Sequence, residues 1–120
     1  MMRNIVRFKD AHAYKAPLHD ETVHSMFLQH KLTGSEGEAW VSISYYLPGA
    51  RAEMSAAPLE RTYVVLDGQL TVEFEDETAV LNPLDTVYIG PNETREARND
   101  TNGVVTMLVV MPYPPESSEG

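Results

Sequence analysis

Two arginines and a tyrosine are the residues of this chain whose types and spacing best suit a chemical role. Arg61 and Tyr63 are two residues apart in a β-prone run, so their side chains share one face of the expected strand. Arg95 stands in a second such run. A guanidinium group binds a carboxylate or phosphate through two parallel hydrogen bonds and stays charged at physiological pH. These residues indicate a site for a small organic anion, provided that they face the interior.

The alternative is that both arginines lie on the surface. Alternation along a strand shows which residues share a face, but not which face is buried. On the surface, Arg61 and Arg95 would pair with acidic residues such as Glu53, Glu60 or Glu96. Both arrangements stay open at the level of sequence.

The run from residue 24 to residue 31 contains two of the four histidines. On a strand, its less polar face would carry His24, Met26, Leu28 and His30, and we expect that face to point inward. A neutral histidine there is a candidate general acid or base, because its unperturbed pKa is about 6.5, or else a hydrogen-bonded wall residue. His24 and His30 would be about 20 Å apart along a strand, too far to hold one ion together. His12 is expected to be exposed in irregular chain.

The composition excludes several classes of function. The chain has no cysteine, which rules out disulfides, thiolate zinc sites and cysteine nucleophiles. Its net charge is −9 and it contains no basic run, which argues against binding to nucleic acid or an anionic membrane. No apolar run approaches the roughly 18–20 residues that span a bilayer, and the first residues lack the apolar core of a secretory signal. We expect a cytoplasmic protein.

The rest of the sequence predicts a single all-β domain. A length of 120 residues suits one domain, and turn-forming residues recur about every 8–12 positions. No long segment keeps a helical period, so we expect no major helix. Many short antiparallel strands favour a closed or two-sheet arrangement, which protects the strand edges. The expected strands are residues 22–32, 39–47, 51–56, 61–67, 69–75, 78–82, 85–89, 94–98 and 104–111.

The turns frame two motifs that resemble those of the cupin superfamily. From Gly49 to Gly68 the spacing is similar to G-x5-H-x-H-x3-E-x6-G, and from Leu84 to Asn99 it is similar to G-x5-P-x-G-x2-H-x3-N. The resemblance implies the cupin double-stranded β-helix, a jelly-roll barrel. Leu84 and Asn92 take the two glycine positions of the second motif. Asparagine is a reasonable substitute, because it tolerates the left-handed conformation.

The same two motifs lack the metal ligands of the family. Cupins that hold a metal use three imidazoles and a carboxylate inside the barrel. At those four positions this chain has Ser55, Ala57, Arg61 and Arg95. Alanine cannot ligate, and two guanidinium groups would repel a cation. We expect no metal and no cofactor, and a metal-dependent dioxygenase is the least favoured function.

In the cupin register, Arg61 and Tyr63 would face into the barrel from one strand and Arg95 from another. The expected ligand is a small carboxylate or phosphate, and a non-catalytic regulatory module is the alternative to an isomerase, lyase or cyclase. Trp40, Tyr45, Tyr46 and Tyr88 are expected mainly in the core or a subunit contact. The candidate binding residues are Arg61, Arg95, Ser55 and Tyr63, and the candidate proton-transfer residues are His24, His30 and Tyr63.

The resemblance also implies an organisation of the chain. Residues 1–20 would form an N-terminal arm, residues 21–112 the barrel and residues 113–120 a flexible tail, since the tail is rich in proline and polar residues. Small cupins of this kind form homodimers, and the β-prone run at residues 4–8 could be exchanged with the partner. His19 could fold over the barrel mouth.

Overall fold

The computed structural model describes residues 3–15 and 21–115. Within these ranges the regular structure is strand apart from two short 3-10 helices, which confirms the all-β prediction, and each of the nine expected strands is present. The 3-10 helices are η1 (Phe8–Asp10) and η2 (Lys31–Thr33), and the strands are β1 (His12–Tyr14), β2 (Val23–Gln29), β3 (Ala39–Tyr46), β4 (Arg51–Ser55), β5 (Arg61–Asp67), β6 (Leu70–Phe74), β7 (Thr78–Leu81), β8 (Thr86–Ile89), β9 (Arg95–Arg98) and β10 (Val105–Pro112).

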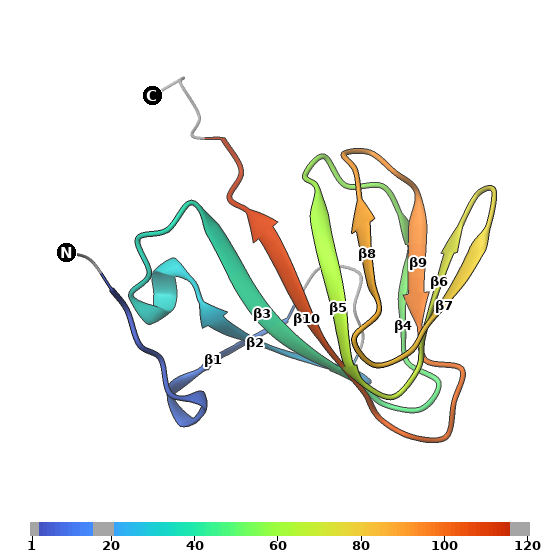
Figure 1. Ribbon diagram of the computed structural model, residues 1–120, viewed down its shortest axis with the longest axis horizontal. Helices are drawn as coiled ribbons and strands as arrows, with labels where there is room; N and C mark the ends of the chain where they lie inside the picture. The colour runs from blue at the N-terminus through green and yellow to red at the C-terminus, as the bar shows by residue number, and fades with distance from the viewer. Residues whose placement is uncertain (1–2, 16–20, 116–120) are drawn as a thin grey trace.

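The strands form two antiparallel sheets that face each other (Figure 1). One sheet has six strands in the order β1-β2-β3-β10-β5-β8, and the other has four in the order β4-β9-β6-β7. Consecutive strands such as β4 and β5 therefore lie in different sheets, as in a jelly roll. The expected two-sheet barrel is confirmed.

The apolar core lies between the sheets, toward the end at which β10 begins and the two sheets come together (Figure 1). Val65, Leu70, Val72 and Val105 are fully buried there. The sheets spread apart toward the opposite end, where β10 finishes (Figure 1). Packing thus closes one end of the barrel and leaves the other wide.

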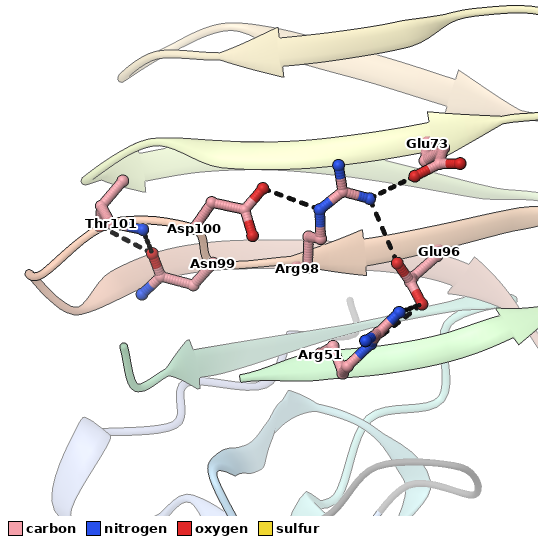
Figure 2. Close-up of polar contacts among 7 residues, drawn as sticks. All are labelled: Arg51, Glu73, Glu96, Arg98, Asn99, Asp100 and Thr101. Carbon is pink, nitrogen blue, oxygen red and sulfur yellow. Dashed lines mark hydrogen bonds and ion pairs between the residues drawn. The ribbon is translucent and has the colours of Figure 1, made fainter. Parts of the chain in front are cut away.

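The outer surface of the four-stranded sheet carries a network of ion pairs (Figure 2). Glu96 accepts hydrogen bonds from Arg51 and Arg98, and Arg98 also pairs with Glu73 and Asp100. The Glu96 side chain is only 6% exposed, so these partners are needed to offset its desolvation. Because residues alternate across a strand, the network directs the intervening residues of β9 toward the interior.

Two turns use the left-handed conformation at residues other than glycine. Leu84 has φ 71° and Asn92 has φ 63°, at the two positions where the second cupin motif has its glycines. Leu84 follows Pro83 in a turn closed by the Asp85 amide, which donates to the Asn82 carbonyl. Proline followed by a residue with positive φ is the arrangement of a type II turn, in which the third position favours glycine.

The N-terminal region differs from the expectation. Residues 12–14 form β1, which pairs with β2, although the sequence placed His12 in irregular chain. The β-prone residues 4–8 are not in a strand; instead Asn4 bonds to Gln29 and to the Thr33 carbonyl. Exchange of this arm and the homodimer stay predictions. His19 and the last five residues of the predicted tail lie outside the described residues.

No helix in the described part of the chain is long and apolar enough to cross a membrane.

Replacing Leu84 with glycine is expected to stabilise the protein. A residue with a Cβ atom is strained by about 1–2 kcal/mol in the left-handed region, and the larger entropy of glycine in the unfolded chain offsets part of the relief. The Leu84 side chain is 77% exposed, so little packing is lost. We expect the free energy of unfolding to rise by about 0.5–1 kcal/mol in urea denaturation. Asn92→Gly is the control and should gain less, because asparagine tolerates this conformation. A loss of stability in Leu84→Gly would contradict the strain argument.

Candidate functional site

A cavity of about 490 Å³ lies between the two sheets at the wide end of the barrel. This volume is typical of sites for small organic molecules. It is bordered by β1, β2, β3, β10 and β5 of one sheet, by β4 and β9 of the other, and by the loop after β4. The lining residues are Tyr14, Ser25, Phe27, Trp40, Ser44, Tyr46, Ala52, Ser55, Ala56, Ala57, Pro58, Arg61, Tyr63, Arg95, Ala97, Met107, Val109 and Met111.

The four predicted binding residues all line this cavity. Arg95 is only 8% exposed and donates through Nη1 to the Ser55 carbonyl oxygen at 2.9 Å and to its Oγ at 3.1 Å. Tyr63 is 4% exposed, and Arg61, two residues earlier on β5, is partly buried and lines the same cavity. The structure therefore favours the inward arrangement of the arginines over the surface arrangement.

Glu96 and Glu60, two of the acidic residues of the surface alternative, have other partners. Glu96 pairs with Arg51 and Arg98 on the outer face of β9. Glu60 accepts a hydrogen bond from the Tyr88 hydroxyl at 3.0 Å. No aspartate or glutamate is among the described residues that line the cavity. The lining thus carries two guanidinium groups and no carboxylate to neutralise them.

Burial shapes the electrostatics of this site. It lowers the pKa of Arg61 from its ordinary value, but a guanidinium so basic at the outset keeps its proton. Burial raises the pKa of Tyr46 well above its ordinary value, and the positive charges of Arg95 and Arg61 offset only part of this rise. The Tyr46 hydroxyl therefore stays protonated and neutral, and Arg61 keeps its positive charge.

A row of hydroxyl groups lies on β1, β2 and β3 of the six-stranded sheet, which also contains Arg61 on β5. The Oγ atoms of Ser25 and Ser44 are 2.8 Å apart, and the Tyr14 hydroxyl donates to Ser42 Oγ at 3.1 Å. The three serines are at most 5% exposed. They form a polar inner wall without unsatisfied groups, because the hydroxyls bind one another.

Aromatic rings form the wall next to these hydroxyls. The Phe27 ring is stacked on Tyr14 at 3.8 Å and 3° and on His30 at 3.8 Å and 15°. Trp40 is perpendicular to Phe27, with the ring centroids 5.4 Å apart. Both faces of the Phe27 ring are therefore covered, and only its edge can point into the cavity.

The predicted inner face of β2 is wrong. Ser25 and Phe27 line the cavity, whereas His24 is exposed on the other face of the sheet and does not reach the site. The prediction assumed that the less polar face is buried. Ser25 is buried although it is polar, because its hydroxyl is hydrogen-bonded to Ser44 on the next strand. His24 cannot move a proton inside the barrel.

His30 is also not where alternation placed it. The pairing of β2 with β3 shifts between Phe27 and Gln29, and the chain then turns into η2. This irregularity brings the His30 ring back to the side of Phe27, at the edge of the aromatic wall. Its Nδ1 accepts a hydrogen bond from the Leu32 amide at 3.0 Å, so the neutral ring carries its proton on Nε2. This contact engages one ring nitrogen with the backbone, and His30 is not among the residues that line the cavity.

Tyr14 and Phe27 were not predicted as lining residues, and Trp40 and Tyr46 were expected mainly in the core or a subunit contact. A signal was available for Trp40, because Trp40, Ser42, Ser44 and Tyr46 alternate along β3 and therefore share one face. Nothing local distinguishes that face from the one with Val41 and Ile43. Tyr45 and Tyr88, from the same predicted set, do not line the cavity.

The donor set at the family's metal position does not suit a metal ion. Arg95 and Ser55, which take two of the four ligand positions, are hydrogen-bonded to each other, and Ala57 and Arg61 take the other two. Guanidinium groups repel a divalent cation, and alanine offers no donor. No group of three or more histidine, cysteine or acidic residues among the described residues could hold an ion.

Comparison with known proteins identifies the family of this chain and a relative of similar length. Residues 42–111 match the Cupin_2 family, described as a cupin domain. A protein of Mycobacterium tuberculosis named beta-D-galactosidase Rv1717 is 37% identical over 110 residues, which cover 92% of this chain and 94% of that protein.

Two solved structures have a similar fold at low identity. The polyketide cyclase RemF from Streptomyces resistomycificus superposes with a TM-score of 0.80 at 20% identity, covering 98% of this chain and 89% of its own. The protein Rru_A2000 from Rhodospirillum rubrum, described as a cupin-2 domain, superposes with a TM-score of 0.77 at 15% identity, covering 97% of this chain and 80% of its own. At these identities the likeness concerns the fold alone.

The contribution of His30 to stability is expected to fall as the pH is lowered. Burial lowers the pKa of His30 in the folded protein, and the nearby charges of Lys31 and His12 lower it further. The unfolded chain then binds the proton more readily, so this contribution is present above about pH 6.5 and is lost as the pH falls through the folded-state value.

His30→Asn keeps an acceptor for the Leu32 amide but cannot titrate. In urea denaturation between pH 7.5 and pH 5, we expect the stability difference between wild type and this variant to shrink as the pH falls. Leu32→Ala, at an exposed position that carries no titratable group, is the control and should keep a nearly constant difference. A difference that grows toward low pH would contradict the assignment of the neutral ring.

Proposed function

Because this chain belongs to the Cupin_2 family of cupin domains, we propose that its barrel binds a small organic anion without a metal ion. The carboxylate or phosphate group of the ligand lies between Arg61 and Arg95. The observation that carries this proposal is the presence of two guanidinium groups in a lining with no acidic side chain among its described residues. An anion supplies the missing negative charge.

The surroundings of the arginines support this binding mode. Arg95 is held by two hydrogen bonds from Nη1 to Ser55, and its other nitrogens, Nε and Nη2, can donate to a ligand. Arg61 is held less tightly, because its contact with the Leu59 carbonyl is 3.5 Å long. Charge-assisted hydrogen bonds from a guanidinium are shorter and stronger than neutral ones, and the buried setting reduces their screening by salt.

Proton transfer next to a carbonyl group is the chemistry that this arrangement suits best. Arginine can stabilise the oxyanion that forms when a proton leaves the neighbouring carbon. Of the three candidate proton-transfer residues, Tyr63 is the one that lines the cavity, beside Arg61. An isomerase, lyase or cyclase is therefore proposed, and a non-catalytic regulatory module in the cytoplasm stays as the alternative.

Replacing either arginine is expected to weaken anion binding. The probes are inorganic phosphate, succinate and benzoate, and binding is measured as a rise in the melting temperature. Arg61→Gln and Arg95→Gln should each lower the affinity of a bound probe about 30-fold, because a charged hydrogen bond contributes about 2 kcal/mol.

Arg7→Gln removes one positive charge from an exposed position and is the matched control. It should leave binding unchanged. The proposal fails if no anion stabilises the wild type, or if both cavity variants respond to the anions as strongly as the wild type does.

Activity on a galactoside is the second candidate, and it rests on the relative from Mycobacterium tuberculosis. An identity of 37% over nearly the whole chain supports a related substrate. The lining argues in the other direction, since most glycoside hydrolases act through a pair of carboxyl groups and the described lining has none.

Hydrolysis of nitrophenyl β-D-galactoside decides between these candidates. We expect the purified protein to release no more nitrophenol than Tyr63→Phe does. Turnover by the wild type that disappears in Tyr63→Phe would establish the galactoside activity and place it in this cavity.

A further inference from the structure

Beyond the arginines, the cavity has an aromatic and apolar part next to its row of hydroxyl groups, and this part indicates which kind of anion fits. This inference rests on the anion site proposed above. Beyond its arginines, the described lining is composed of aromatic rings, serine hydroxyls, alanines, methionines, one proline and one valine. It contains no amide, imidazole, ammonium or carboxylate group. Such a surface suits the body of an apolar molecule better than a sugar.

The described lining offers a polyhydroxylated ligand hydroxyl and guanidinium groups but no carboxylate, amide or imidazole, and several of the hydroxyls already bind other protein groups. Ser25 and Ser44 bind each other, Tyr14 donates its proton to Ser42, and Ser55 accepts from Arg95. Each hydroxyl that is buried without a partner costs about 1–3 kcal/mol. A sugar acid has several hydroxyl groups, so the cost would exceed the gain from one charged group.

The wall favours a flat ring. Phe27 can present only its edge, because Tyr14 and His30 cover its two faces. The edge of an aromatic ring is positive and attracts the negative face of another ring. Methionine sulfur also makes favourable contacts with aromatic rings, and Met107 and Met111 line the cavity between the aromatic wall and the arginines.

The spacing of the strands sets the scale of such a ligand, since it separates the backbones of the residues at its two ends. Trp40 pairs with Met111 across β3 and β10, and Val110 pairs with Thr62 across β10 and β5, so that Arg61 is next to Met111 in the same row. Arg61 and Trp40 are thus two strands apart, about 10 Å. An acid with two fused rings spans this distance.

We propose that the ligand is a flat aromatic acid of about two rings, whose anionic group binds Arg61 and Arg95 and whose ring packs against Phe27 and Trp40. The two aromatic residues then determine specificity, and the arginines supply affinity for the charge. This assignment separates aromatic acids from sugar acids, which carry the same charge.

The experiment compares three carboxylates of equal charge by isothermal titration calorimetry. The probes are 2-naphthoate, its saturated analogue decahydro-2-naphthoate, and galacturonate. We expect 2-naphthoate to bind at least tenfold more tightly than either of the others. Trp40 is the single tryptophan of the chain, so 2-naphthoate should also change its fluorescence at the same concentrations.

Two variants locate the ring. Phe27→Leu and Trp40→Leu should each weaken 2-naphthoate at least fivefold and leave the binding of inorganic phosphate unchanged. Tyr45→Leu removes an aromatic ring from the opposite face of β3 and should change neither. If an aromatic variant folds poorly, the comparison of the three acids on the wild-type protein still tests the proposal.

The outcomes separate the two proposals. Tighter binding of galacturonate or of the saturated acid than of 2-naphthoate overturns the aromatic assignment and leaves the anion site intact. If none of the acids and no phosphate binds, the anion site itself fails, and the aromatic assignment fails with it.

Discussion

The alternation of side chains along β9 is the constraint on which the site depends. Glu96 and Arg98 point outward into the ion-pair network of the four-stranded sheet (Figure 2), and Arg95 and Ala97 therefore point inward. A shift of one residue would turn Glu96 toward the cavity and Arg95 toward the outer face of the sheet. Both carboxylate and guanidinium groups of the network would then lose their partners, which is strongly unfavourable for a buried charge. The outer network thus holds the inner arginine in place.

The charge of the interior is opposite to that of the whole chain. The net charge is −9, yet the described cavity lining carries two guanidinium groups and no carboxylate. The acidic partners near the site, Glu96 and Glu60, are engaged on outer faces by Arg51, Arg98 and Tyr88. The low dielectric of the interior strengthens the local positive field, so the cavity can attract an anion within a negatively charged protein.

The cupin barrel supports many kinds of chemistry, so membership of the family does not by itself determine the substrate. The relative named for galactosidase activity and the structural neighbour named as a polyketide cyclase share the fold of this chain. In a barrel, the residues that project inward from the strands form the site. In this chain they are arginine, serine and aromatic residues, which is why the argument for function rests on the lining.

The sequence by itself determined the strands, the turns and the face that Arg61 shares with Tyr63. The turn positions were readable because their requirement is local: Gly68 and Asn92 have positive φ, and even Leu84 adopts it where the motif has glycine. The inward direction of Arg95 followed from the cupin register and is confirmed.

Only the tertiary structure decided which face of β2 and β3 is buried and which rings form the wall. From the sequence, Ser25 and Tyr14 did not look more buried than His24. The hydroxyl of Ser25 is hydrogen-bonded to Ser44, 19 residues away, and that of Tyr14 to Ser42, 28 residues away. The irregular pairing after Phe27 moved His30 across the sheet. Burial of a polar side chain depends on the partner that another strand brings to it, and no local pattern contains that partner.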